Sequence, residues 1–245
     1  MLFPRAILRR SLACTLRRAV DVADQFLHIR SLLSEKGAGT PCLDGDRAIE
    51  WSWVVAHLPR SPCRVLDVGC VQSALTGIAA RLGHQVTAVD LRDIEYEMDN
   101  VVFVQGNITD VTLPAAGFEV IINCSTVEHV GLAGRYNGRP DADGDLTAMK
   151  ILAASLTSGG RMLLTIPVGR DAVFLPMHRV YGSARLPALL RGYRIVAEEY
   201  WTKEADNIWR RTQRDQALQV KASERFYALG CFVLQREDNS GQSCP

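Results

Sequence analysis

The stretch that decides the fold is Arg64-Val-Leu-Asp-Val-Gly-Cys-Val-Gln-Ser73, where an apolar run ends in an acid and a glycine. The run Cys63–Val68 predicts a buried strand, and residues 73–82, closed by Gly83, predict a helix directly after it. A strand that enters a helix through a tight glycine turn is the first half of a βαβ unit. Ligands of such folds bind outside the carboxyl ends of the strands, where the backbone can approach them closely.

The rest of the chain repeats this alternation of strands and helices. Helical spacing is found over residues 46–58, which we expect to be capped by Asp44 or Asp46, and over 145–156. Apolar runs predict further strands over residues 85–89, 101–104, 118–123, 161–168, 193–198 and 225–234. The chain is therefore predicted to form a Rossmann-like, doubly wound α/β fold with a mostly parallel seven-stranded sheet and an antiparallel final strand. A long polar segment before that strand predicts a helix or a functional flap.

Composition indicates an ordinary globular protein. The chain has 245 residues, of which 47% are hydrophobic and 22% charged, and its net charge is +1. This length suits one α/β domain, which we place at residues 46–235, between a basic N-terminal helix with its linker (1–45) and a flexible tail (236–245). Because the net charge is close to zero, nucleic acid is not expected as a partner.

Cysteine usage and hydropathy bear on the location of the protein. Its seven cysteines form no CxxC pair, which predicts a reducing, cytoplasmic environment and no metal site. No apolar run reaches the ~20 residues that span a bilayer.

Residues 1–20 hold five arginines and no acid, with apolar residues at roughly helical spacing. We expect a helix packed on the domain; the alternatives are peripheral contact with an anionic membrane and a mitochondrial transit peptide.

The loop after the first strand predicts the kind of ligand. Gly69 would leave out a side chain where the ligand passes, and Asp67 would shape the turn and pair with an ammonium group. Dinucleotide binders carry GxGxxG here and hold a pyrophosphate at a helix N-terminus. In this chain Val71 and Ser73 take the places of the later glycines. The loop therefore favours a ligand without phosphate, with Ser73 among its contacts.

The ends of the next two strands predict a nucleoside site. Asp90, followed by Leu91, ends the second strand about twenty residues after the glycine loop, where a carboxylate can accept hydrogen bonds from both ribose hydroxyls. Arg92 leaves a 2′-phosphate open as an alternative. After the third strand, Asn107 could bind the adenine amine while Ile108 packs on the ring.

These features resemble class I S-adenosylmethionine (SAM)-dependent methyltransferases in order and spacing, from about residue 47 to 235. The resemblance includes the turn Ser158-Gly-Gly-Arg before the fifth strand. Further segments look like a poorly characterised methyltransferase-like family of unknown function, found in bacteria and nematodes. They are Ser125-Thr-Val-Glu-His-Val-Gly-Leu-Ala-Gly-Arg-Tyr136, Asp141-Ala-Asp-Gly-Asp-Leu-Thr-Ala-Met-Lys150, Ile166-Pro-Val-Gly-Arg-Asp171 and His178-Arg-Val-Tyr-Gly182. The resemblance implies a fold and SAM as cofactor, and it leaves the substrate open.

The fourth strand should deliver Cys124 and Ser125 to the rim beside the reacting sulfonium. Two histidines near that rim, His129 and His178, are candidate general bases, and Glu128 is a candidate partner of the first. Packing alone is the alternative role for each histidine. Methyl transfer depends largely on positioning, so both roles are compatible with activity.

Two charged groups of the central loops remain. The acids of Asp141-Ala-Asp-Gly-Asp145 are expected to cap the following helix, with a metal-assisted site as the alternative. Five loop arginines could hold an anionic substrate or lie in solvent: Arg135, Arg139, Arg170, Arg179 and Arg185.

We therefore expect a SAM-dependent methyltransferase that acts on a hydroxyl of a small molecule or of a glycan or glycolipid sugar. A non-catalytic SAM-binding scaffold or sensor is one alternative, and an NAD(P)-linked oxidoreductase is another. The expected partner is a small-molecule or sugar substrate, with peripheral membrane contact through residues 1–20 as a further possibility.

Overall fold

The computed structural model describes residues 41–133 and 139–237. The predictions for residues 1–40, for Arg135 and for most of the tail lie outside this part. Contacts group residues 41–204 with the chain from Ile208 onward into one unit, which carries everything described below. Its helices are α2 (Asp46–His57), α3 (Leu75–Arg81), α4 (Gly144–Ser155), α5 (Arg185–Leu189) and α6 (Arg214–Gln219), with 3-10 helices η1 (Cys70–Gln72) and η2 (Val127–His129).

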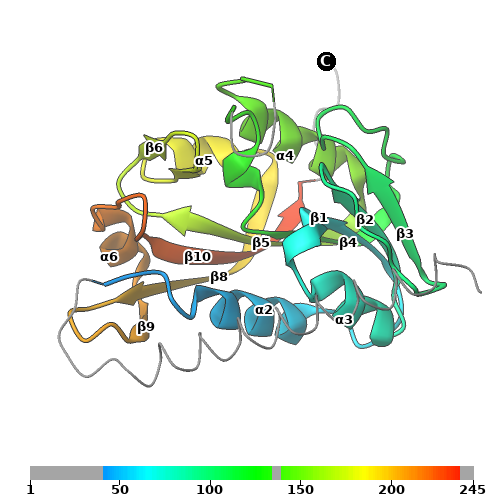
Figure 1. Ribbon diagram of the computed structural model, residues 1–245, viewed down its shortest axis with the longest axis horizontal. Coiled ribbons are helices and arrows are strands. Elements are labelled where there is room, and N and C mark those ends of the chain that lie inside the picture. Colours follow the sequence, from blue (N-terminus) through cyan, green and yellow to red (C-terminus); the bar gives the residue numbers. More distant parts are fainter. Residues whose placement is uncertain (1–40, 134–138, 238–245) are drawn as a thin grey trace, which may run out of the picture. The chain divides into compact units, whose positions relative to one another are not determined.

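The strands form one large sheet and one hairpin (Figure 1). They are β1 (Arg64–Val68), β2 (Gln85–Asp90), β3 (Val101–Gln105), β4 (Phe118–Cys124), β5 (Leu156–Val168), β6 (Ala172–Phe174), β7 (His178–Val180), β8 (Tyr193–Lys203), β9 (Trp209–Thr212) and β10 (Ala228–Arg236). The order in the large sheet is β3-β2-β1-β4-β5-β10-β8-β9, and β6 pairs with β7.

The large sheet is parallel from β3 to β5, and β10 then runs antiparallel to both β5 and β8. The predicted Rossmann-like fold with an antiparallel final strand is confirmed. The sheet has one strand more than the seven predicted. The addition is β9, whose Trp-Arg-Arg-Thr sequence lacks the apolar alternation that marks a strand, and which pairs only with the edge of β8. Helix α6 follows it, in the polar segment where a helix or flap was expected.

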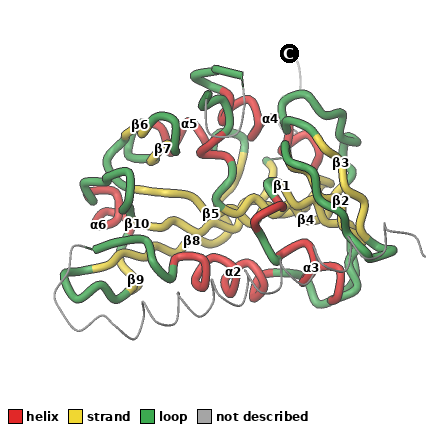
Figure 2. Tube along the Cα trace, in the orientation of Figure 1, coloured by secondary structure: helices red, strands yellow, loops and turns green. Residues whose placement is uncertain are grey.

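Helices cover both faces of the sheet. Figures 1 and 2 show α2 and α3 on one face and α4 and α5 on the other. Successive β1 side chains point to opposite faces of the sheet. Val65 packs with α2 and α3 on one face, and Leu66 packs with α4 on the other. A strand buried on both faces must be apolar throughout, which explains the continuous run in the deciding stretch.

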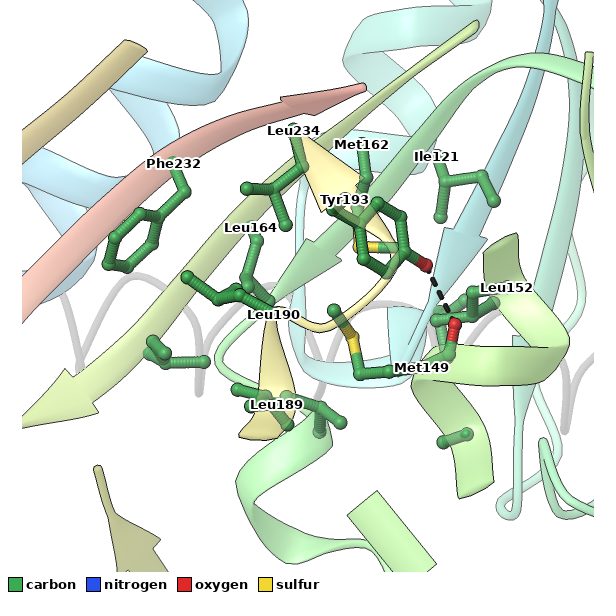
Figure 3. Close-up of a cluster of buried hydrophobic side chains, with 14 of the residues drawn as sticks. Ile121, Met149, Leu152, Met162, Leu164, Leu189, Leu190, Tyr193, Phe232 and Leu234 are labelled. Atoms are coloured by element: carbon green, nitrogen blue, oxygen red, sulfur yellow. Dashed lines mark hydrogen bonds between the residues drawn. The ribbon is translucent and has the colours of Figure 1, made fainter. Parts of the chain in front are cut away.

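The core on the α4 face is shown in Figure 3. Met149 and Leu152 of α4 meet strand residues such as Leu164, with Tyr193 between them. The Tyr193 hydroxyl donates a hydrogen bond of 2.7 Å to the Met149 carbonyl oxygen, so this buried phenol has its polar partner. The packed layer holds α4 and β5 in place and thereby fixes the edge at which β4 and β5 end.

The structure corrects the predicted helix caps. The N-cap of α2 is Gly45, with φ 84°, and Asp46 is instead the first helical residue. At α4 the N-cap Asp143 makes no side-chain cap hydrogen bond, and Asp141 instead accepts from the Asp143 backbone N–H at 2.9 Å. The acids before α4 therefore shape a turn, and Asp145 points into the protein, where it is fully buried.

No helix within the described residues is both long and apolar enough to cross a bilayer. Nor do those residues contain a group of three or more His, Cys, Asp or Glu side chains arranged to hold a metal ion.

Candidate active site

A cavity of about 300 Å³ lies at the carboxyl ends of β1, β2 and β4. It is lined by segments distant in sequence: the start of α2, the loop after β1, the end of β2, the loops after β3 and β4, and residues near β7 and β10. Of the predicted site residues, those that line it are Gly69, Ser73, Asp90, Leu91, Asn107, Ile108, Cys124, Ser125, Glu128, His129 and His178. The structure therefore brings all but Asp67 into one cavity.

Gly69 is required by its backbone and by a close neighbour. Its φ is 79°, in the left-handed region that favours glycine, and its N–H donates to the Val89 carbonyl at 2.8 Å. A Cβ at this position would overlap the Thr126 side chain. The glycine was predicted to make room for the ligand, but its nearest neighbour is Thr126, which donates to the Val68 carbonyl at 3.0 Å. Gly69 thus lets the β1 and β4 loops touch beneath the cavity.

Asp67 does not contact the cavity, which corrects its predicted role in pairing with an ammonium group. The carboxylate is 1% exposed and accepts a hydrogen bond of 2.6 Å from the Thr76 hydroxyl of α3. Burial raises the pKa of Asp67 to about 6. The residue ties the strand to the helix that follows and supports the loop from below.

Asp90 lies at the cavity and joins two loops. Its Oδ2 accepts from the Val71 backbone N–H at 3.0 Å, and its Oδ1 accepts from the Arg92 backbone N–H at 2.9 Å. A carboxylate has about four lone-pair sites, so two backbone donors leave capacity for two hydroxyl groups. The Arg92 side chain lies 3.5 Å from the same carboxylate. Asp90 is therefore held in place as an acceptor at the cavity wall.

The loop after β3 supplies the next part of the wall. Asn107 and Ile108 both line the cavity, and Ile108 is 5% exposed. The Asn107 side-chain oxygen accepts from the Thr109 N–H at 3.2 Å, which orients the amide. The Asn107 amide is suited to hydrogen bonding with the edge of a purine ring, and the Ile108 side chain is suited to packing against its face.

The end of β4 is anchored by a buried acid that sequence reasoning missed. Glu50 of α2 is fully buried and accepts from the Ser125 hydroxyl and, at 2.7 Å, from the Thr165 hydroxyl. Its other oxygen lies 2.8 Å from the Arg47 guanidinium. Ser125 has a φ of 46°, so this network holds it in a conformation that non-glycine residues rarely adopt. The signal was available, because Glu50 shares a helix face with Trp53 and Val54, which are buried.

The two histidines have different surroundings. His129 lines the cavity at 17% exposure, and its Nδ1 lies 2.5 Å from the Met177 carbonyl oxygen, so Nδ1 carries the hydrogen. Its Nε2 lies 3.6 Å from a Glu128 carboxylate oxygen. His178 is packed between the rings of Phe174 and Tyr227, at centroid distances of 5.5 and 5.1 Å. His129 has the geometry of an oriented base, and His178 that of a packed wall residue.

Two of the loop arginines have structural roles, which corrects the expectation that they hold an anionic substrate. Arg179 is 2% exposed and donates to the carbonyl oxygens of Val130 and Asp141 at 2.6 and 3.1 Å. Arg185 pairs with the buried Asp145 at 2.5 Å. Arg179 thus joins the β6–β7 hairpin to the loop after β4 and to the segment before α4, and Arg185 joins α5 to the start of α4.

The two other described arginines of the predicted set do not line this cavity, although Arg139 lines a neighbouring one. Arg139 is exposed and pairs with Asp110 at 2.6 Å. Arg170 does not line the cavity. No described loop arginine of the predicted set is therefore placed to bind a ligand there.

Solved methyltransferase structures share this fold. The chain is 18% identical to a Burkholderia thailandensis 1,6-didemethyltoxoflavin-N1-methyltransferase, crystallised with that substrate and S-adenosylhomocysteine (SAH), over 94% of this chain and 90% of that one, with a TM-score of 0.51. It is 14% identical to the Bradyrhizobium japonicum N-methyltransferase NodS, in complex with SAH, over 86% and 99% of the two chains, with a TM-score of 0.53. A [4+2]-cyclase, SpnF, matches at 14% identity over 82% and 85%, with a TM-score of 0.55.

At these identities the likeness establishes the Rossmann-like methyltransferase fold. The family is established separately, because the family described as "Caenorhabditis protein of unknown function, DUF268" matches residues 81–229, more than half of the chain. The protein belongs to that family. No curated protein sequence matches the chain significantly.

Proposed function

We propose that this protein is a SAM-dependent methyltransferase that methylates a hydroxyl group of a small molecule or of a sugar in a glycan or glycolipid. The observation that carries the proposal is that one cavity joins the β1 loop and Asp90 to His129. When bound, the cofactor supplies a methyl group on a sulfonium. Two of the similar structures were crystallised with SAH, which supports the choice of cofactor.

The donor set of the cavity fits an adenosyl amino acid better than a dinucleotide. The Asp90 carboxylate can accept from the ribose hydroxyls, and Asn107 with Ile108 can hold the adenine. After Gly69 the chain enters the three-residue helix η1, and the next glycine is Gly77. A pyrophosphate cradle needs glycines and helix N–H groups in that interval, so the NAD(P) alternative is disfavoured.

His129 is the residue that we propose to take the proton from the acceptor hydroxyl. Because Nδ1–H donates to the Met177 carbonyl, Nε2 presents its lone pair and can accept a proton. The resulting positive charge would be stabilised by the Glu128 carboxylate, 3.6 Å from Nε2. The Glu50 network would fix Ser125 and Cys124 beside the reacting groups.

The cofactor assignment is tested by titration calorimetry with SAM and SAH, followed by transfer of a labelled methyl group to a panel of hydroxylated acceptors. Asp90→Ala should weaken SAH binding by about 1–3 kcal/mol, because a charged acceptor is lost. Asp215→Ala, at an exposed position of α6 away from the cavity, is the matched control and should bind normally. His129→Gln should keep SAH binding and lower turnover.

Three results would contradict the proposed methyltransferase function. Absence of SAM and SAH binding would remove the proposed function. Tight SAH binding without methyl transfer to any acceptor would favour a cofactor-binding protein with another role. If NADP raises the melting temperature of the protein and SAH does not, an oxidoreductase is favoured.

A further inference from the structure

The wall of the cavity includes a tyrosine whose hydroxyl has no partner among the described residues and is open to the cavity. Tyr227, just before β10, lines the cavity, is 7% exposed, and packs edge-on against His178. Among the described residues, none makes a hydrogen bond to its hydroxyl. Buried tyrosine hydroxyls usually find a partner.

The hydroxyls of three other buried tyrosines have protein partners, whereas the hydroxyl of the partly buried Tyr96 has none among the described residues. The hydroxyl of Tyr181 donates to Asp145 at 3.1 Å, that of Tyr193 to the Met149 carbonyl at 2.7 Å, and that of Tyr200 to Glu198 at 2.8 Å. Tyr227 differs from them because its ring forms part of a cavity wall. Burial and nearby carboxylates raise its pKa well above the ordinary range, so the phenol keeps its proton and is a hydrogen-bond donor. A ligand oxygen or neutral nitrogen would complete its hydrogen bonding.

The charges around this hydroxyl are mainly negative. The carboxylates of Glu50, Asp46 and Glu128 all act on Tyr227, and the opposing cation is Arg47. Because the Arg47 guanidinium is 2.8 Å from Glu50, one of these acids already neutralises it. Lys203 also acts on Asp46, whose pKa burial raises to about 6. Above that pH the two remaining carboxylates, Asp46 and Glu128, outnumber this one cation, and the balance favours a cationic group over carboxylate or phosphate.

Asp46 is the carboxylate best placed to meet such a cation. It lines the cavity at the first turn of α2, and one of its oxygens accepts from the Arg47 backbone N–H at 2.7 Å. No described side chain donates a hydrogen bond to it. Its second oxygen is therefore available for a ligand at the same wall as Tyr227.

We propose that the methyl acceptor is a cationic amino alcohol: Tyr227 donates to an oxygen of the acceptor, and Asp46 pairs with its ammonium group. This inference rests on the proposed methyltransferase function and narrows its substrate. It also reverses the expectation of an anionic substrate held by loop arginines.

The test uses the full chain, with and without saturating SAH, and calorimetric titration of three matched sets of small molecules. These are glucosamine, glucose and glucuronate; galactosamine, galactose and galacturonate; and ethanolamine, ethylene glycol and glycolate. In at least one set the amine should bind about ten- to a hundredfold more tightly than its neutral counterpart, since a charged pair is gained. The acid should bind most weakly.

Two variants assign the contacts. Asp46→Asn should remove the advantage of the amine while leaving the neutral member unchanged, and Tyr227→Phe should weaken amine and neutral alcohol by the same factor. Asp215→Asn, exposed on α6, is the matched charge control. If a variant does not fold, the charge series on the unmodified protein still decides the question.

The outcomes separate the two proposals. An amine preference that Asp46→Asn removes supports the assigned ligand contacts even if SAH fails to bind, in which case the methyltransferase proposal, and with it the role of the amine as methyl acceptor, is lost. SAH binding with no amine preference in any set, or with tightest binding of an acid, overturns the acceptor assignment and leaves the cofactor assignment standing.

Discussion

Asp67 is the last residue but one of β1 and Asp90 the last of the neighbouring β2, yet the two carboxylates have different surroundings. Asp67 is enclosed beneath the loop with the Thr76 hydroxyl as its donor, and Asp90 lies at the cavity with two backbone donors. Both acids are visible in sequence as the last polar residues of apolar runs. The donors that reach each carboxylate decide its role, a helix side chain for Asp67 and backbone N–H groups for Asp90, and they depend on packing.

Removing the charge of Asp67 should stabilise the protein in a pH-dependent way. Its pKa in the folded state is about 6, above the ordinary 3.8, so ionisation opposes folding. The penalty is absent below about pH 4, grows as the pH rises toward 6, and is complete above that. Asp67→Asn should therefore raise the free energy of unfolding by about 2–3 kcal/mol at pH 8 and by almost nothing at pH 4.

Urea unfolding of both proteins at pH 4, 6 and 8 measures this difference. The Asn side chain keeps an oxygen for the Thr76 hydroxyl, so the comparison isolates the charge. A difference that is constant with pH would show that Asp67 is not buried as described.

At the scale of elements, two glycines in helices have opposite surroundings. A Cβ on Gly77 of α3 would lie 3.6 Å from the end of the Arg81 side chain, which is ordinary contact. A Cβ on Gly144, the first residue of α4, would lie 2.9 Å from the Gly131 Cα and 3.1 Å from its nitrogen. The loop after β4 and the start of α4 therefore touch through their backbones, and this contact positions Glu128 and His129.

Alanine at these two positions should change stability in opposite directions. Gly77→Ala should raise the free energy of unfolding by about 0.5–1 kcal/mol, because alanine loses less conformational freedom in a helix. Gly144→Ala should lower it by about 1–3 kcal/mol, because the backbone of the neighbouring loop must shift. Equilibrium denaturation of both variants gives the signs, and equal effects would contradict the close approach at α4.

At the scale of the whole molecule, the last strand of the chain lies inside the sheet. β10 pairs with β5 on one side and β8 on the other. Its side chains enter both cores, Phe232 on the α4 face and Cys231 on the α2 face. The sheet is therefore incomplete until the end of the chain has been added.

A chain that ends at Tyr227 should fail to unfold cooperatively, because both neighbours of β10 would be left with unpaired edges and open cores. A chain that ends at Glu237 keeps all of β10 and should retain the cooperative transition. Circular dichroism melting of the two truncated proteins checks this. Cooperative melting of the shorter chain would show that β1 to β5 form a stable unit alone.

The sequence by itself determined the order of strands and helices from α2 to β5, the parallel sheet and the strand ends that form the cavity, but not β6, β7 or α5. These follow from local patterns: apolar runs, the turn at Gly69 and the acids that end β1 and β2. Such patterns depend on neighbours along the chain, so they can be recognised without coordinates. The weakly patterned β9 was missed for the same reason.

Only the tertiary structure decided which polar residues share a wall of the cavity. Glu50 accepts hydrogen bonds from Ser125 and Thr165, which are distant from it in sequence. The Arg179 guanidinium donates to carbonyl oxygens that are also distant from it in sequence. A side chain's partners are set by distances between elements, and sequence spacing does not encode them. For this reason sequence could not show that Arg179 and Arg185 have structural roles, or that Asp46 and Tyr227 line the cavity.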